Sequence, residues 1–502
     1  MDGKQGSKEA GPAQLKKHSK RPLILISIIL AMFMGAVEGT IVSTAMPEIV
    51  GELGGFSLYS WVFSAYLLMN TVTVLIYGKL SDLFGRKPVM VFGISIFLLG
   101  SLLAGFSWSM QSLIVFRLIQ GFGAGAVTPI ATTIVGDIYT REERARIQGY
   151  LSSVWGISAI IGPALGGFFV QYTSWSWIFW INIPLGILSL IGLVVFFKED
   201  VAKKKHSIDY KGSILLTLSI SLLMYIFVEG GVRIPWSSLG MLSLGMIVIV
   251  LFGLFVWHEN RALEPIMPFV IWKEKSILIA NLTSLTTGMI LIGISSYLPA
   301  FVQGVMGKSP TVAGFTLTAM SIGWPLASTI SGRLLLKIGY RNTCLAGGVF
   351  LVAGGLVFTF LTGQDGPLLA ACGSFLIGVG MGLTSTAFIV SIQSTVSWEQ
   401  RGVATAANMF MRNLGNTIGA ALLGGVLNNQ LSRYLMDKGE NGSVTLNSVN
   451  ELLSSDIRPT INPERLELLQ NGLTHSLSSV YSIVFVFALM SLILIWFMPK
   501  KE

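Results

Sequence analysis

Charged residues are scarce in this sequence. Only 12% of its 502 residues are Asp, Glu, Lys or Arg, whereas a soluble domain carries about 25%. Hydrophobic residues make up 52%, and apolar runs of about 20 residues, enough to cross a bilayer as a helix, recur along the chain. Alternating segments of about ten residues, typical of membrane β-barrels, are absent. The sequence therefore predicts an all-α, polytopic membrane protein.

Residues that build metal and redox sites are also scarce. The two cysteines, Cys344 and Cys372, both lie in apolar runs, which excludes a disulfide framework and a cysteine-based metal site. The four histidines are scattered outside the expected membrane core. The pattern Gly-x-x-x-x-Gly-Lys-Ser/Thr is missing, and the glycines of segment 121–125 lack the strand-turn-helix setting of a dinucleotide site. We therefore expect no enzyme, no cofactor and no metal.

The apolar runs predict fourteen spans in two blocks of six with a pair between them. We place them near 22–46, 57–77, 88–107, 109–134, 146–170, 175–197, 211–230, 236–257, 275–300, 310–332, 343–362, 367–394, 402–428 and 476–498. The expected parts are a basic tail (1–21), an N-terminal half (22–200), two inserted spans with their loops (201–270) and a C-terminal half (271–502). One long external loop is expected at 429–475, with a helix start at Asn462-Pro463. This loop acts as a tether or as a lid.

The basic residues indicate the orientation. With the N-terminus in the cytoplasm, most of the 34 Lys and Arg residues fall on inner segments, among them Lys20, Arg21 and the run 203–205. This asymmetry follows the positive-inside rule and predicts that both termini are cytoplasmic. The formal net charge of +9 thus reflects membrane topology rather than nucleic-acid binding. The first apolar run lacks a cleavage site and is expected to be a retained helix of a cell membrane protein.

An internal repeat divides the chain. The segment 78–87, GKLSDLFGRK, returns as 332–341, GRLLLKIGYR, and the alternating glycines of 121–125 return in 378–382. The matching segments are separated by nearly the same number of residues. This predicts two parallel six-helix halves, as in transporters that rock two halves around a central site.

Several motifs resemble those of a known family. The segment 78–87 resembles the loop motif between the second and third helices of the major facilitator superfamily, and 117–121, RLIQG, resembles its fourth-helix motif. The segment 162–167, GPALGG, resembles the fifth-helix motif of antiporters. With 38–47 and 175–184, the whole chain is similar to the fourteen-helix drug:H⁺ antiporter family. The resemblance implies a proton-coupled antiporter that exports small amphipathic drugs across the cytoplasmic membrane, that is, multidrug efflux.

Two of these motifs are expected to act in conformational change. In the first, Gly78, Asp82, Gly85, Arg86 and Lys87 lie at a cytoplasmic edge, where Asp82 could hold a helix N-terminus or pair with a basic residue. Such a latch would favour an outward-open state and would be one-sided, because position 336 of the second copy is leucine. The alternative is that its basic residues only fix topology.

In the second conformational motif, small residues allow close helix packing and a proline allows bending. The residues concerned are Gly162, Pro163, Gly166 and Gly167. The alternative is packing alone.

Ionisable residues inside the membrane are expected to carry proton coupling. Glu38 follows Arg21 by about 25 Å of helix at 1.5 Å per residue, and Arg117 on the descending fourth span lies at a matching depth. We therefore expect Glu38 to be the proton carrier and Arg117 to approach it; the alternative is a purely structural pair. Asp137 is a further candidate for proton coupling, although the arginines that follow it favour a surface ion pair.

The candidates for substrate contact combine apolar area with adjustable polar groups. They are Trp61, Tyr66, Asn70, Tyr297, Gln303, Asn408, Met409 and Arg412. The tenth and thirteenth spans carry no carboxylate, which disfavours dicationic substrates. Apart from protons, lipid and substrate we expect no obligatory partner, and predict a monomer. The alternatives to drug efflux are a specific exporter of an endogenous metabolite or metallophore and a proton-coupled importer.

Overall fold

The structure is a computed structural model that describes residues 20–139, 141–199, 209–230, 234–262, 265, 267, 269–396, 401–438, 445–453 and 457–499. Within these ranges the chain is almost entirely helical and contains no named strand. The expected all-α fold is therefore confirmed. The basic tail through residue 19 and the basic run 203–205 lie outside the described residues.

The helices follow one another with short connections. The N-terminal half contains α1 (Arg21–Leu53), η1 (Phe56–Leu58), α2 (Tyr59–Phe84), α3 (Arg86–Gly105), α4 (Met110–Ile138), α5 (Arg141–Tyr172), α6 (Trp177–Trp180) and α7 (Asn182–Phe196). The inserted pair is α8 (Tyr210–Glu229) and α9 (Leu239–Glu259), followed by η2 (Phe269–Lys273). The C-terminal half contains α10 (Lys275–Ala300), η3 (Phe301–Val305), α11 (Pro310–Thr359), α12 (Pro367–Thr395), α13 (Arg401–Lys438), η6 (Leu446–Ser448), α14 (Val449–Leu453), η7 (Arg458–Thr460) and α15 (Pro463–Trp496).

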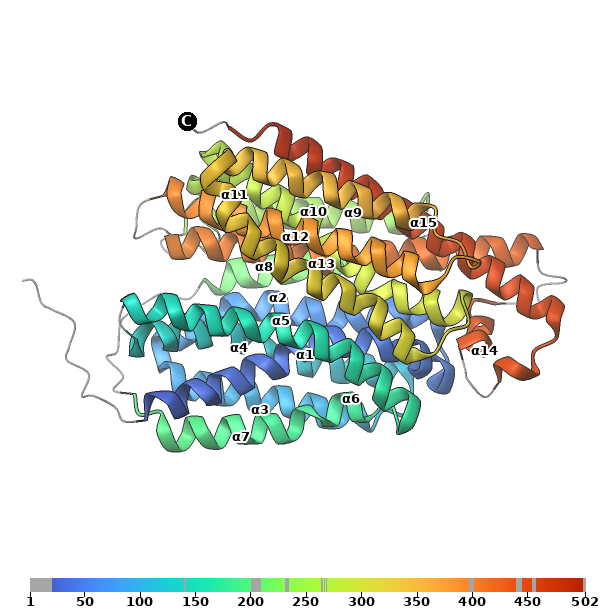
Figure 1. The fold of residues 1–502 in the computed structure, drawn as a ribbon, viewed down its shortest axis with the longest axis horizontal. Coiled ribbons are helices and arrows are strands. Elements are labelled where there is room, and N and C mark those ends of the chain that lie inside the picture. Colours follow the sequence, from blue (N-terminus) through green and yellow to red (C-terminus); the bar gives the residue numbers. More distant parts are fainter. Residues whose placement is uncertain are drawn as a thin grey trace, which may run out of the picture.

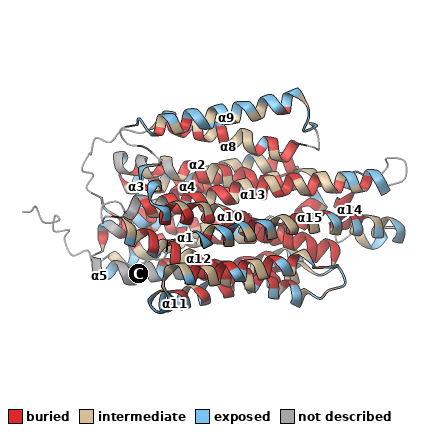
Figure 2. Cartoon of the chain, turned by 90° about the horizontal axis from the view of Figure 1, so that it is seen from above, coloured by how far each residue is buried: buried red, intermediate tan, exposed pale blue. Residues whose placement is uncertain are grey.

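The two halves form separate helix groups (Figure 1). The N-terminal end of α1 and the C-terminal end of α15 lie on the same side of the molecule. We call this side the terminal end and the opposite side, which carries α14, the loop end. The inserted pair packs on α2 and α13 through α8, while α9 lies at the edge of the molecule (Figure 2). Apolar side chains of α9 such as Leu239 and Ile249 are 84% and 67% exposed. A helix that is apolar all round and so little covered fits a lipid-facing position.

Twelve helices of the described chain are long and apolar enough to cross a membrane. One of them, α11, has 50 residues and bends at Gly339, where the backbone leaves the helical region. It contains the span expected at 310–332 and most of the span expected at 343–362. The helix α13 covers the span expected at 402–428 but is not among the twelve. The count of fourteen spans stays a prediction.

The internal repeat reappears in the backbone. Gly85 and Gly339 occupy equivalent positions in the two copies and both have positive φ, 95° and 79°, a conformation that side chains disfavour. Two residues further on, Lys87 donates to a carbonyl of α7 at 2.8 Å, and Arg341 donates to a carbonyl of α15 at 2.8 Å. The two copies of the loop therefore make matching contacts within their own halves.

The repeated glycines also occupy matching places. A Cβ on Gly121 of α4 would strike the carbonyl of Tyr66 on α2, and a Cβ on Gly378 of α12 would strike the carbonyl of Met320 on α11. In both halves the glycine lets two helix backbones approach closely. The sequence repeat is therefore a repeat of helix packing.

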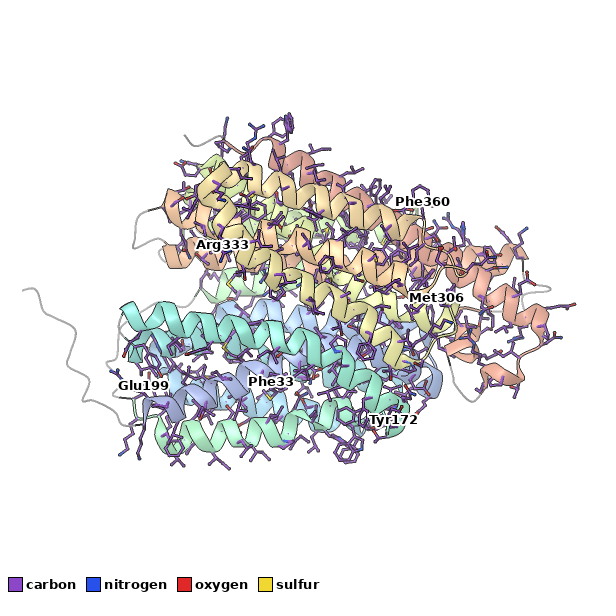
Figure 3. The ribbon with its side chains drawn as sticks, viewed as in Figure 1. Phe33, Tyr172, Glu199, Met306, Arg333 and Phe360 are labelled. Carbon is purple, nitrogen blue, oxygen red and sulfur yellow. The ribbon has the colours of Figure 1, made fainter. Side chains whose placement is uncertain are left out.

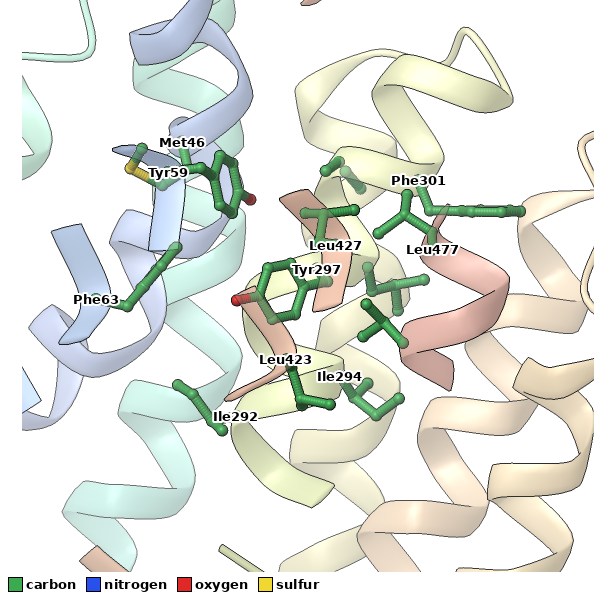
Figure 4. Close-up of a cluster of buried hydrophobic side chains, with 14 of the residues drawn as sticks. Met46, Tyr59, Phe63, Ile292, Ile294, Tyr297, Phe301, Leu423, Leu427 and Leu477 are labelled. Atoms are coloured by element: carbon green, nitrogen blue, oxygen red, sulfur yellow. The ribbon is translucent and has the colours of Figure 1, made fainter. Parts of the chain in front are cut away.

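The two halves meet at the loop end. Tyr59 donates to the carbonyl of Ser296 at 2.6 Å, and its ring stacks on that of Tyr297 with centroids 5.8 Å apart. Figure 4 shows these two tyrosines facing each other, with Phe63 on the side of the N-terminal half. Closer to the middle, the hydroxyl oxygens of Thr71 on α2 and Thr417 on α13 lie 3.0 Å apart.

The expected loop 429–475 is mostly helical. The helix α13 continues to Lys438, and α15 starts at Pro463 with the amide of Glu464 bound to Asn462 Oδ1 at 3.2 Å. The extensions pair because Leu431 and Leu435 of α13 and leucines of α15 share one buried cluster. The segment between the helices is therefore shorter than expected.

The described residues of this segment, 445–453 and 457–462, form a cover at the loop end. Asn450 accepts from the amide of Phe56 at 3.0 Å in the N-terminal half. Arg458 donates to the carbonyl of Gln303 at 2.6 Å in the C-terminal half. The cover thus contacts both halves, beyond what a simple tether requires.

Candidate functional site

The membrane interior of the N-terminal half contains a buried ion pair. Glu38 of α1 and Arg117 of α4 have exposed fractions of 0% and 2%, and Arg117 Nη1 contacts Glu38 Oε1 directly. The sequence placed these two residues at matching depths along their helices, and this contact agrees with that placement. A buried charge is costly unless it is paired, so each residue compensates the other.

Polar side chains complete the coordination of the pair. Asn182 Nδ2 donates to the second oxygen of Glu38 at 2.7 Å. Gln120 Oε1 accepts from Arg117 at 2.6 Å, and Gln120 Nε2 donates to Ser101 Oγ at 2.8 Å. These contacts join α1, α3, α4 and α7 into one network inside a single half.

Sequence reasoning did not assign roles to Asn182 and Gln120. The signal for Gln120 was present, because it lies three positions after Arg117 and therefore on the same helix face. Asn182 comes from a distant helix, and only the tertiary structure brings it to Glu38.

Tyr66, expected as a substrate contact, also packs on this network. Its ring lies 4.1 Å from Arg117 Cζ, and its side chain is buried. A guanidinium over an aromatic face gains electrostatic stabilisation. Arg117 is therefore fixed by a carboxylate, an amide oxygen and an aromatic ring at once.

The motif 78–87 binds its own half at the terminal end. Arg86 Nε donates to Asp137 Oδ2 at 3.3 Å, in a pair whose aspartate is half exposed. Glu199, labelled in Figure 3 at the terminal end, accepts from the amides of Arg86 and Lys87 at 2.7 and 2.8 Å. It thereby caps the N-terminus of α3. The side chain of Asp82 lies outside the described residues.

The placement of Asp137 separates it from the buried pair. Its side chain is 52% exposed and pairs with Arg86, which corresponds to the surface ion pair favoured by its neighbours in sequence. Glu199 was not identified from the sequence, where it appears as one acid in a mixed-charge segment.

The small residues of the fifth-helix motif face two different helices. A Cβ on Gly162 or Gly166 would strike a threonine hydroxyl of α1. A Cβ on Gly167 would lie 2.7 Å from the Cα of Thr311 on α11, and the carbonyl of Pro163 faces Gly314 of the same helix. The motif therefore allows α5 to pack within its own half and against the other half.

Three of the remaining substrate candidates lie away from the middle of the molecule. Trp61 Nε1 donates to Glu229 Oε1 of the inserted helix α8 at 3.2 Å. Tyr297 lies 3.0 Å from Ser60 Oγ, and Gln303 Nε2 donates to the carbonyl of Thr44 at 3.0 Å. The last two residues therefore join the halves at the loop end.

The other candidates lie on α2 and α13. Asn70 is partly buried and precedes Thr71, which contacts the other half, and Met409 is 39% exposed. Asn408 donates to Asn281 and Ser284 of α10, and Arg412 lies over a tryptophan of α11.

Three features of this structure are typical of a membrane transporter. They are two pseudo-equivalent helix groups, a polar network inside the membrane and a repeated loop motif. The chain matches the model of the Major Facilitator Superfamily over residues 28–420, and it belongs to this family. The superfamily assignment predicted from the motifs is confirmed. The protein is accordingly a multi-pass cell membrane transporter.

Two relatives of Bacillus subtilis (strain 168) are similar over most of the chain. Multidrug transporter protein MdtP is 36% identical over 425 residues, which cover 84% of this chain and 78% of the relative. Multidrug resistance protein 3 is 33% identical over 494 residues, which cover 97% of this chain and 96% of the relative.

The fold also matches solved transporter structures. A bacterial homolog to the human lysosomal transporter Spinster, in an inward-facing and unoccupied conformation, aligns with a TM-score of 0.66 and 13% identity, covering 99% of this chain and 100% of that chain. The nucleoside transporter NupG aligns with a TM-score of 0.60 and 14% identity, covering 96% of this chain and 99% of that one. At these identities the likeness establishes the fold alone.

Proposed function

We propose that this protein is a proton-coupled antiporter that exports small amphipathic compounds from the cytoplasm. The observation that carries the proposal is the buried Glu38–Arg117 pair within its polar network. The relatives named as multidrug transporter and multidrug resistance proteins support the direction and substrate class. In this proposal both termini are cytoplasmic and the loop end faces outward.

The proton would be carried by Glu38. Protonation removes the charge that compensates Arg117, which would leave a buried cation beside neutral acceptors, the oxygens of the protonated Glu38, of Gln120 and of Val62. Because an unpaired buried charge costs several kcal/mol, the protonated network favours a different arrangement of α1 and α4. Proton binding is thereby converted into a conformational preference.

The driving force depends on the charge of the exported compound. Exchange of one proton for one monocation is electroneutral, so only the pH gradient contributes, at about 1.36 kcal/mol per pH unit. For a neutral compound the membrane potential adds about 2.3 kcal/mol per charge per 100 mV.

The test is proton movement in inverted membrane vesicles with an acidic interior. Addition of ethidium, a fluoroquinolone or a lincosamide should alkalinise the interior of wild-type vesicles. Glu38→Gln should abolish this response, while Glu467→Gln, which changes an exposed acid on α15, should leave it intact. A response that survives in Glu38→Gln would move the proton site elsewhere, and a wild type that responds to no compound would contradict export of these amphipaths.

A further inference from the structure

The C-terminal half contains an enclosed cation without an acidic partner. Arg412 of α13 is partly buried, and its Cζ lies 5.8 Å from the ring centre of Trp324 on α11. Within the described part of the chain, its guanidinium takes part in no ion pair and no hydrogen bond. Since unpaired charges inside a membrane are costly, such a residue is a candidate for function.

The side chain of Arg412 approaches a second helix of its own half, and both helices take part in contacts between the halves. It reaches from α13 to α11, and both helices contact the N-terminal half. Thr417 of α13 lies 3.0 Å from Thr71 of α2, and Pro325, the residue after Trp324, packs against Gly156 of α5. In a transporter built from two halves, helices at the interface between the halves border the substrate path.

The neighbourhood of Arg412 contains buried amide groups whose hydrogen-bonding capacity is not fully used. Asn408 and Asn416 lie one helical turn on either side of it, on the same face of α13, and Asn416 Oδ1 is buried without a partner among the described residues. Asn408 donates to Asn281 Oδ1 at 3.1 Å, which leaves Asn281 Nδ2 as a donor that is fully buried and has no partner among the described residues. The guanidinium itself carries five N–H donors. What this region lacks, within the described chain, is a negatively charged acceptor.

The enclosed arginines of the two halves therefore differ in whether their charge is compensated. In the N-terminal half Glu38 compensates Arg117, whereas the described residues around Arg412 provide no carboxylate. We propose that Arg412 binds an anionic group of the exported compound, such as a carboxylate, so that the preferred substrates are amphipathic acids or zwitterions. This inference rests on the proposed export function and narrows its substrate class.

The chemistry of an arginine suits this role. Its planar guanidinium binds both oxygens of a carboxylate at once, in a geometry that an ammonium group does not reproduce. Trp324, whose ring lies next to the guanidinium, would offer an aromatic surface to the ring system of an amphipathic compound. Export of a monoanion in exchange for an imported proton would also move the equivalent of two positive charges into the cell per cycle. The membrane potential would therefore contribute to the driving force for both movements.

The test uses a matched pair of ligands, a fluorescent rhodamine with a free carboxylate and its methyl ester. Their binding to the purified full chain is followed by fluorescence polarisation. Arg412→Gln should weaken binding of the acid roughly ten- to a hundredfold, the range for a hydrogen bond to a charged group, and should change binding of the ester less than about twofold. Arg412→Lys should retain part of the preference because it keeps the charge.

A matched control is available in the same half. Arg341 Cζ also lies over a tryptophan, 5.4 Å from the ring centre of Trp496, but Arg341 follows the bend of α11 and contacts the last turn of α15. Arg341→Gln should leave the binding of both ligands unchanged. Without ligand, Arg412→Gln should melt at a higher temperature than the wild type, since an uncompensated charge has been removed, whereas a structural role for Arg412 predicts a lower melting temperature.

Each other outcome overturns the inference. Equal weakening of acid and ester, or no change of either, would show that Arg412 does not recognise the anionic group. If phosphatidylglycerol displaces the acid in wild type but not in Arg412→Gln, the anionic group that Arg412 binds is a lipid headgroup. Binding of the ester alone by the wild type would refute the anion site while leaving export intact, whereas a wild type that binds and transports neither would refute both proposals.

Discussion

The contact between α5 and α11 at the loop end leads to a prediction about conformational change. The Cβ of Gly167→Ala would lie 2.7 Å from Thr311 Cα, and within 2.9 Å of two further backbone atoms of α11. Ordinary carbon contacts begin at about 3.5 Å, and a backbone atom cannot rotate away as a side chain can. The two helices would therefore have to separate by roughly 0.8 Å or more where the halves meet.

The cost falls on one conformation only. Overpacking of this kind costs about 1–3 kcal/mol, and it is removed when the loop end opens and α5 and α11 part. The equilibrium should therefore move toward the open loop end by roughly 5- to 150-fold. In the proposed orientation this is the outward-open state.

The assay is a distance measurement between spin labels at the loop end. Tyr172 at the end of α5 and Phe360 at the end of α11 are 65% and 72% exposed, and both lie at the loop end (Figure 3). Labels at these positions, with Cys344 and Cys372 replaced, should show a larger population at longer distances in Gly167→Ala.

The control is Gly245→Ala, because a Cβ there meets no atom within 4 Å on the exposed helix α9. It should leave the distance distribution unchanged. If Gly167→Ala also leaves it unchanged, or shifts it to shorter distances, the close contact between α5 and α11 does not govern closure at the loop end.

Further predictions concern the loops at both ends. Glu199→Gln should lower the melting temperature by weakening the cap of α3, a loss of about 0.5–2 kcal/mol, whereas the exposed change Glu467→Gln should have no effect; equal effects would refute the capping role. Arg458→Gln removes the donor to a carbonyl of η3 and should favour the open loop end in the same spin-label assay; an unchanged distribution would show that the cover does not hold the halves together. Thr362 donates to Asp365 and holds its pKa below the usual range, so protection of the Thr362 amide from hydrogen exchange should persist at neutral pH and be lost as the pH falls through that lowered pKa. Protection that persists in Asp365→Asn would contradict this.

Much of the architecture could be predicted from the sequence because lipid imposes simple requirements on it. The membrane helices could be predicted from apolar runs of bilayer length and from the sparse charge. The two groups of helices and the transporter family could be predicted from the repeated loop motif. The depths of Glu38 and Arg117 also indicate that they lie at one level, since helix rise is constant. Local rules such as the Asn462 cap identify helix starts well.

Contacts between distant helices depended on the tertiary structure. Asn182 reaches Glu38 and Glu199 reaches the start of α3 because α7 packs beside α1 and α3, and no periodicity in sequence encodes this. The packing of Tyr66 on Arg117 is likewise a contact between two helices, and the expected contact of Tyr66 with substrate stays a prediction.

The boundary of the long loop also depended on tertiary contacts. The ends of α13 and α15 are stabilised by each other, so they remain helical where the sequence becomes polar. The sequence by itself determined which segments are long and apolar enough to cross a membrane, because hydropathy is a property of each segment alone. Only the tertiary structure decided which polar groups meet there, because side chains find partners across helices that are far apart along the chain.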